Sequence, residues 1–373
     1  MRLFLTGILS VFFLSGHFFG GVDEQTFETP AIPFNPRSYV CFRTVAPLTI
    51  DGILNEVSWE KTSWTDFFVD ISVPGRKKPR YRTRAKMLWD DQFFYVAASL
   101  EEPHVWATLR ERDAVIFQDN DFEVFIDPDG DTHLYYELEI NALGTVWDLL
   151  LEKPYRDGGK ALNGWDIRGL QSACRIDGTL NNPLDRDKGW TVELAFPWEV
   201  LKEMAPEECS PGPGDVWRVN FSRVEWENEI QNGRYVKRSD PDTGKPLPED
   251  NWVWSPQGLV NMHYPEMWGF VRFSGVTAGG EEIFRIEPEE KTKWLLRLVY
   301  YRQKLFYEKH GVFSSETSPL GLATLLGEKM RQLQLERTQS LFEAALPCPE
   351  GEGTWRIRQD GLVWKKDKEK RHE

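Results

Sequence analysis

Closely spaced carboxylates are the residues of this sequence with the clearest chemical potential. Asp127, Asp129 and Asp131 alternate around Gly130. Oxygen ligands at this spacing suit a hard cation such as calcium. The stretch lacks the 12-residue loop ending in Glu that an EF-hand requires, so a solvated acidic turn is the alternative. We expect calcium as the one structural ion, and no organic cofactor.

A second set of carboxylates, at Glu123, Glu137 and Glu139, falls in strand-like segments. Two carboxylates on adjacent strands could serve as the acid and the nucleophile of a glycoside hydrolase. Every solvated strand face carries such pairs, however, and the sequence contains no G-x-S-x-G, H-E-x-x-H or P-loop motif. The six His show no metal-ligand spacing. We therefore expect a protein without its own catalysis, with a hydrolase that uses Glu123 and Glu139 as an alternative.

The composition narrows the class of partner. The chain has 373 residues, and 45 Lys+Arg against 59 Asp+Glu give a net charge of −14. An acidic chain without a long basic block argues against nucleic acid as a partner. The 16 Trp and the 13% aromatic content exclude a wholly disordered chain. Tryptophan either fills cores or stacks on flat apolar ligand faces, so the question is which role dominates.

The N-terminus has the layout of a secretory signal peptide. One Arg is followed by a short, interrupted apolar run and small residues, so residues 1–21 are predicted to be cleaved and 22–37 to be a linker. No later stretch is apolar enough to span a bilayer. We expect a secreted, periplasmic or envelope-associated protein with no integral membrane domain after cleavage, with an uncleaved N-terminal anchor as the alternative. Export would permit disulfides, with free buried thiols as the alternative; the cysteines are Cys41, Cys174, Cys209 and Cys348.

Residues 38–275 are predicted to form an antiparallel β-sandwich, jelly-roll-like, with little helix. Tyr136, Leu138 and Ile140 alternate with polar residues, which is typical of a strand with one buried face. Short runs of this kind are separated by Gly, Asp and Pro turns. The predicted strands are 85–88, 93–100, 121–126, 135–141, 145–151, 190–196, 217–224 and 270–273.

Residues 276–373 are predicted to be a C-terminal helical extension with a short hairpin and a charged tail. Pro288 and Gly311 suit the start and the stop of a helix over 288–310. Its stripe of Trp294, Leu298, Tyr301 and Leu305 predicts packing against the sandwich, with a membrane or partner face as the alternative. We expect a second helical stretch over 320–345 and a hairpin over 353–365.

A series of short blocks carries a resemblance to a known family. They are Ile50-Asp51-Gly52 with Glu56 and Trp59, Leu88–Asp91 with Phe94–Val96, Asp121–Pro128, Gly189–Glu193 with Phe196–Trp198, Gly214–Asn220 with Arg223, and Trp254 with His263, Pro265, Glu266 and Gly269. In this order the blocks, spread over about residues 40–275, resemble the family 9 carbohydrate-binding modules. The resemblance implies a β-sandwich without catalytic residues, in a secreted protein that holds a glycan or oligosaccharide between aromatic rings. It also implies an association with a secreted glycoside hydrolase or an envelope partner in polysaccharide catabolism. Bound calcium is common in the family.

The resemblance also implies which residues contact the sugar. One ring of the family's clamp precedes the D-x-x-E strand, where Phe117 stands in place of the usual Trp; the second falls on Trp252 or Trp254. Glu123 matches the family's acidic residue. Glu139 is a departure, because some members carry a basic residue there. Asn141, Trp147 and Trp165 could add polar or ring contacts.

Two further alternatives stay open at the level of sequence. One is a structural envelope module that has lost sugar binding, which the Phe117 and Glu139 departures favour. The other is a haem protein of a related sandwich type, with Met262 or His263 as axial ligands.

Overall fold

The computed structural model describes residues 27–367 apart from 76, 350 and 352. The predicted signal peptide, the first part of the predicted linker and the end of the charged tail lie outside these residues. Within the part of the chain that is described, no helix combines the length and the apolar character needed to cross a membrane.

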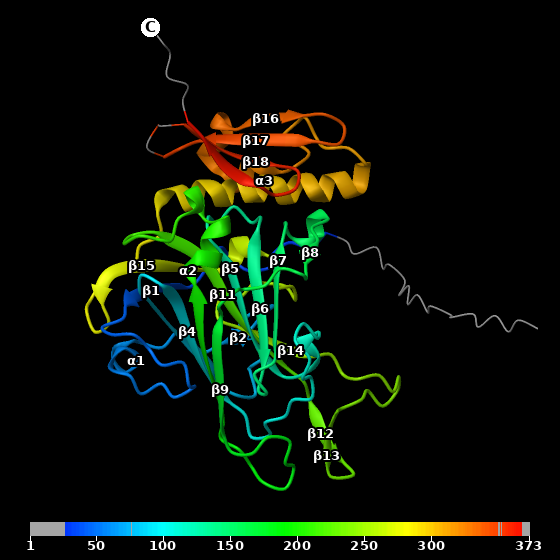
Figure 1. Cartoon of the computed structure of the whole chain (residues 1–373). Coiled ribbons are helices and arrows are strands. Elements are labelled where there is room, and N and C mark those ends of the chain that lie inside the picture. The colour runs from blue at the N-terminus through cyan, green and yellow to red at the C-terminus, as the bar shows by residue number, and fades with distance from the viewer. Residues whose placement is uncertain (1–26, 76, 350, 352, 368–373) are drawn as a thin grey trace, which may run out of the picture.

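The body of the molecule is a β-sandwich made from one continuous sheet that folds back on itself (Figure 1). The sheet follows the order β8-β7-β6-β5-β11-β15-β1-β3-β4-β10-β9, with β14 and β2 branching from β11. Every strand predicted from alternation is present. The bounds are β1 Ser38–Arg43, β2 Val69–Asp70, β3 Thr83–Trp89, β4 Phe93–Glu101, β5 Asp121–Asp127, β6 Tyr135–Asn141, β7 Val146–Leu151, β8 Ala161–Leu162, β9 Gln171–Asp177, β10 Gly189–Pro197, β11 Val216–Glu225, β14 Asp250–Val253 and β15 Gly269–Thr277.

The two halves of the sheet enclose the main hydrophobic core. Val124 and Leu138 on one half, and Val96 and Leu194 on the other, belong to the same buried cluster. Their strand neighbours point to the outer faces, as period-2 alternation requires. The predicted mainly-β sandwich is confirmed, with one departure: β1 runs parallel to both β15 and β3, so the sheet is not wholly antiparallel.

Helices in the sandwich are short, as expected, and are α1 (Val57–Lys61) and α2 (Trp198–Leu201). A separate hairpin, β12 (Asn228–Gln231) with β13 (Arg234–Lys237), projects from it (Figure 1). All four cysteines are free thiols, of which Cys41 and Cys348 are buried and Cys209 is exposed.

The C-terminal extension is a helix with a small sheet behind it. The long helix α3 (Pro288–His310) has the predicted bounds and lies between the sandwich and a four-stranded antiparallel sheet (Figure 1). Gly311 ends it in the left-handed conformation at φ 69°. The sheet consists of β16 Gln334–Arg337, β17 Phe342–Pro347, β18 Thr354–Arg358 and β19 Val363–Lys366, of which β18 and β19 are the predicted hairpin.

The predicted helix over 320–345 is wrong beyond Gln332. Only α4 (Leu322–Leu326) and a short 3-10 turn are helical, and β16 and β17 follow. Phe342, Ala344 and Leu346 alternate toward the core of the extension, and a run this short does not distinguish helix from strand by its period. The helical stripe is also wider than predicted: Leu305 is 38% exposed, whereas Leu296 and Val299 are fully buried.

Buried polar groups join α3 to the sandwich. The Arg156 guanidinium donates to both carboxylate oxygens of Glu266, at 2.8 and 3.0 Å, and the Tyr301 hydroxyl donates to Glu266 at 2.6 Å. The Tyr300 hydroxyl donates to Asp157 at 2.6 and 2.7 Å. We call these five residues the seam. The extension is therefore anchored to the sandwich by buried, fully partnered side chains.

Candidate functional site

Four carboxylates lie together on the outer side of β5 and β6, where we had expected sugar contacts. Glu123 and Glu139 are directly opposite each other in the strand pair, and Asp121 and Glu137 are their neighbours on the same face. The carboxylate oxygens of Asp121, Glu123 and Glu139 lie within 4.8 Å of one another. All four side chains are buried. We call Asp121, Glu123, Glu137 and Glu139 the acidic face.

Burial and like charges favour the protonated form of these groups. Burial, the largest cause, raises the pKa of Glu123 to about 7. Burial again, and then the negative charges of Glu123, Asp121 and Glu137, hold the pKa of Glu139 well above its usual range. A carboxyl group in this state can donate or accept a hydrogen bond near neutral pH, which is useful toward a hydroxyl ligand.

Aromatic rings flank the acidic face. The backbone amide of Phe117 donates to Glu139 at 2.8 Å, and its half-buried ring lies 6.4 Å from that of Trp147. Trp147 pairs with Glu139 across β6 and β7. The structure therefore brings Phe117, Glu123 and Glu139 together with Trp147, which was also a candidate ring contact.

A lysine and a further indole complete this edge. The Trp226 Nε1 donates to the Phe117 carbonyl at 2.8 Å, and the Lys237 ammonium lies 3.2 Å from the centre of the Trp226 ring. Lys237 also donates to Gln118 at 3.2 Å. Sequence reasoning missed Lys237 because it lies on the β12–β13 hairpin, more than a hundred residues from Phe117, and no local pattern connects the two.

The predicted second ring of the clamp is wrong. Trp252 and Trp254 are 0% and 1% exposed, so neither offers a face to a sugar. β14 is hydrogen-bonded on both sides, to β11 and β2, and both of its faces are covered. Trp254 packs on Phe221, and a Cβ at Gly269 would lie 2.3 Å from its ring, so Gly269 exists to admit the indole.

Asn141 is also wrong as a sugar contact. Its side-chain amide donates to the Leu109 carbonyl at 2.9 Å and to Asp119 at 3.0 Å. Its side-chain oxygen accepts from the Leu143 and Thr145 amides. These bonds hold the turn after β6, and they leave the buried amide no role toward a ligand.

The predicted calcium ligands form a tight acidic turn. Oxygens of Asp127, Asp129 and Asp131 lie within 4.8 Å of one another. Asp127 accepts from the Gly130 and Thr132 amides, both at 3.0 Å. Burial and the neighbouring Asp129 raise the pKa of Asp131 to about 7. Because each oxygen keeps a free lone pair and the cluster has surplus negative charge, the residues fit a calcium ion.

Met262 and His263, the haem alternative, are packed side chains. His263 shares a hydrogen bond of 3.0 Å with the Tyr135 hydroxyl, and its ring lies 4.5 Å from that of Tyr155. Burial lowers the pKa of His263 to about 3, so the ring is neutral. These contacts match a packing role.

The opening motif of the resemblance is explained by one buried carboxylate. Glu193 accepts hydrogen bonds from the Asp51 and Gly52 amides, at 3.1 and 3.0 Å, and from the Trp59 indole at 2.8 Å. Gly52 adopts φ +79°, and a Cβ there would meet Arg175 at 3.0 Å. The motif thus fixes the loop before α1 onto β10. Residues 50–212 match a family model described as "Carbohydrate family 9 binding domain-like".

This stretch is a family 9-like domain. The match spans fewer than half of the 373 residues. No curated protein matches the chain.

Three solved structures that are similar to this chain have carbohydrate-related descriptions. A family 9 carbohydrate-binding module from Caldicellulosiruptor kristjanssonii, in complex with cellotriose, has 15% identity and a TM-score of 0.40, over 67% of this chain and 100% of that chain. The same organism's family 9 module in complex with glucose gives the same values. A putative carbohydrate-binding protein from Bacteroides uniformis has 16% identity and a TM-score of 0.44, over 64% of this chain and 100% of that chain.

Proposed function

We propose that this chain is a secreted carbohydrate-binding protein that holds a sugar, such as a glycan end, at the acidic face without catalysing its cleavage. The observation that carries the proposal is the placement of the half-buried Phe117 and Trp147 rings beside the Glu123–Glu139 pair, within a family 9-like domain. The role we assign is recognition during polysaccharide breakdown.

The chemistry of the acidic face suits a sugar. A pyranose has apolar C–H faces and a rim of hydroxyl groups, so rings can cover the face while carboxyls bond the rim. Glu123, with a pKa of about 7, exchanges between donor and acceptor near neutral pH. Lys237, over Trp226, adds a cationic donor at the same edge.

Retention on immobilised glucan and xylan, and calorimetry with a reducing disaccharide, test the proposal. Phe117→Ala and Trp147→Ala should each weaken binding by about fivefold or more, since ring contacts of this kind contribute about 1 kcal/mol or more. Trp364→Ala, which removes a half-buried ring from the extension, is the matched control and should bind normally. Absence of binding to every glycan on a broad array would refute the proposal and favour a structural envelope module.

A hydrolase is the second candidate, favoured by the approach of Glu123 and Glu139. Oxygens of the two carboxyls lie within 4.8 Å, near the roughly 5–5.5 Å separation of retaining glycosidases. Such an enzyme would release reducing sugar, and Glu123→Gln would abolish that release while leaving binding measurable. Binding without any sugar release supports the non-catalytic reading.

We further propose calcium as a structural ion at Asp127, Asp129 and Asp131. Burial, together with the negative charge of Asp129, raises the pKa of Asp131 to about 7, and an ion there would offset both. At a hundredfold excess over Kd, calcium should stabilise the folded protein by about 2.7 kcal/mol and thereby raise the Tm. A chelator should reverse the shift. Asp129→Asn should weaken this response, and Asp242→Asn, in the similar exposed turn after β13, should not. An unchanged Tm would contradict the calcium proposal.

Secretion is tested separately from binding. N-terminal sequencing of protein recovered from the culture medium or the periplasm should begin after residue 21. A cell-retained chain that still begins at Met1 would contradict export.

A further inference from the structure

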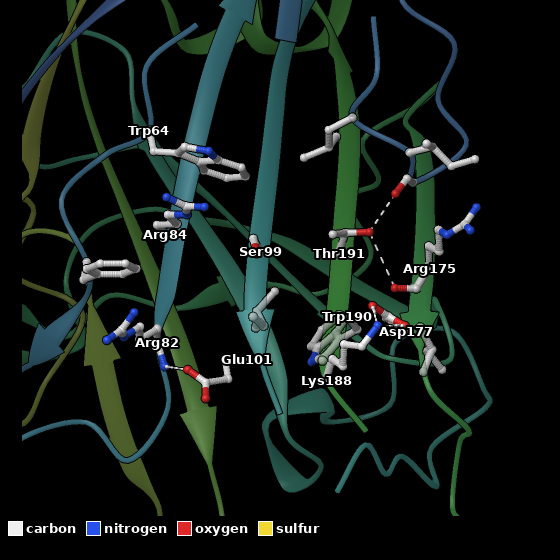
Figure 2. Close-up of a pocket in the computed structure, with 17 residues that line it drawn as sticks. Trp64, Arg82, Arg84, Ser99, Glu101, Arg175, Asp177, Lys188, Trp190 and Thr191 are labelled. Carbon is white, nitrogen blue, oxygen red and sulfur yellow. Dashed lines mark hydrogen bonds and ion pairs between the residues drawn. The ribbon is translucent and has the colours of Figure 1, made fainter. Parts of the chain in front are cut away.

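A groove with a small-residue floor crosses the outer side of the other half of the sandwich (Figure 2). Its volume is about 740 Å³, within the range of ligand sites. Arg84 on β3, Ser99 on β4, Thr191 on β10 and Arg175 on β9 pair in register, so they form one row across four strands. The two arginines stand on strands about 14 Å apart, from three strand spacings, with only short side chains between them.

One end of the groove is closed by a rigid wall. The Thr191 hydroxyl donates to the Gly52 carbonyl at 2.6 Å, and the Gly52 amide donates to the Glu193 carboxylate at 3.0 Å. Ile53 and Leu54 continue this wall. The groove is therefore a preformed feature of the fold.

The groove is cationic in an acidic protein. Arg82, Arg84, Arg175 and Lys188 line it against two carboxylates, Glu101 and Asp177. Among the described residues, no ion pair forms at Arg82, Arg84 or Arg175, and the Lys188–Asp177 pair is exposed. The chain as a whole has a net charge of −14, whereas this groove, with its three guanidiniums outside ion pairs, is locally positive.

Two aromatic rings stand with the arginines on one side. The Arg84 guanidinium lies 4.3 Å from the centre of the half-buried Trp64 ring, and Figure 2 shows Arg84 directly beneath that indole. The Arg82 guanidinium lies 5.5 Å from the ring of Phe67, which is 45% exposed. Stacking holds both guanidiniums in place and leaves their N–H groups free to donate.

From this arrangement we infer that the groove binds an acidic oligosaccharide, one that carries carboxylates on its sugar rings. Guanidiniums pair with carboxylates in bidentate geometry, and Trp64 and Phe67 suit the apolar faces of the same sugars. Ser99 and Thr191 leave room for a ring on the floor. A polyphosphate would use the charges but has no apolar face to place against the two rings.

This second surface lies on the half of the sandwich opposite the acidic face and does not depend on the proposed function there. Neutral sugar should bind at Phe117 and Trp147, and acidic sugar at the groove. Loss of one activity leaves the other measurable, so the two proposals fail separately.

Calorimetry with an oligogalacturonate of four sugars and with its fully methyl-esterified form tests the inference. The ester has the same rings without the charge. The acidic form should bind and the ester should bind at least tenfold more weakly, and salt should weaken only the former. Arg84→Ala and Arg175→Ala should each lower affinity about twofold to fivefold, the range for partly exposed charge pairs.

Arg302→Ala, which removes an exposed arginine from α3, is the matched control and should leave the affinity unchanged. Circular dichroism of each variant establishes that the fold survives. Equal binding of the ester, or unchanged affinity in the Arg84→Ala, Arg175→Ala double variant, would overturn the inference. Tripolyphosphate binding as tightly as the oligogalacturonate, and displacing it, would also overturn it, because the groove would then select charge alone.

Discussion

The seam and the acidic face both bury carboxylates, but only the seam balances them. At the seam, burial alone would raise the pKa of Glu266, yet Arg156 and Arg297 outweigh it and the pKa is lowered. On the acidic face, burial is followed by further negative charges, so the pKa values of Asp121, Glu137 and Glu139 are held well above their usual range. Carboxyl groups that are equally buried therefore have pKa values shifted in opposite directions at the two places.

The difference separates a structural site from a candidate functional one. A paired buried charge fixes two elements against each other, whereas strongly shifted, unpaired carboxyls in a shared face are typical of sites that meet a ligand. Removing a charged side chain from the seam should therefore destabilise the fold. The acidic face should gain stability when a charge is removed.

Breaking the seam has the largest expected effect. Arg156→Ala leaves Glu266 buried without the guanidinium nitrogen that donates to both of its oxygens, and it removes a neighbour of Asp157. Removing one partner of a buried pair costs about 3–5 kcal/mol, so the midpoint of urea unfolding should fall sharply. Arg302→Ala on the exposed side of α3 is the control and should stay within about 0.5 kcal/mol. A loss below about 1 kcal/mol for Arg156→Ala would mean that the seam does not anchor the extension.

Neutralising the acidic face should act in the opposite direction. The folded-state pKa of Glu123 is about 7, above the unfolded value near 4.3, so the folded state binds the extra proton. Stability from this group is fully present below pH 4.3 and is lost as pH rises through 7. Glu123→Gln should flatten this decline and stabilise the protein by on the order of 1–3 kcal/mol at pH 8.

Thermal unfolding between pH 5 and pH 8 measures that effect. Glu199→Gln, at a carboxylate that is 82% exposed, is the control and should leave the slope of Tm against pH unchanged. A wild-type Tm that rises over this interval, or a Glu123→Gln variant that loses stability at pH 8, would show that the acidic face is balanced by a partner.

The same contrast explains what the sequence could predict. The strands and α3 follow from residue alternation, helix-stop signals and local turns, which are visible within short windows. The pairing of Glu123 with Glu139 follows from two adjacent strands. The contact of Lys237 with the Trp226 ring could not be predicted, because it depends on the position of the β12–β13 hairpin, which is distant in the sequence.

The placement of tryptophans was harder still. The order of the family blocks indicated Trp252 and Trp254 as ligand rings. That order does not show whether other parts of the protein cover both faces of the strand. Because β14 is paired on both edges and packed on both faces, those indoles fill the core. Trp147 keeps exposed area because its register in β7 places it on the outer face of the sheet, beside Glu139. Trp64 lies in the loop between α1 and β2, where no strand pairing covers it.

The smallest expected effect comes from a charge pair at the rim of the extension. Lys365 on β19 donates to Glu289 on α3 at 3.1 Å, but the two side chains are 38% and 32% exposed. Water screens such a pair, so Lys365→Ala should cost at most about 1 kcal/mol, less at high salt. Urea unfolding at 0.05 and 0.5 M NaCl measures both numbers. A cost approaching that of Arg156→Ala would mean that solvent exposure does not decide how strongly a charged pair holds α3. Burial would then not explain the strength of the seam.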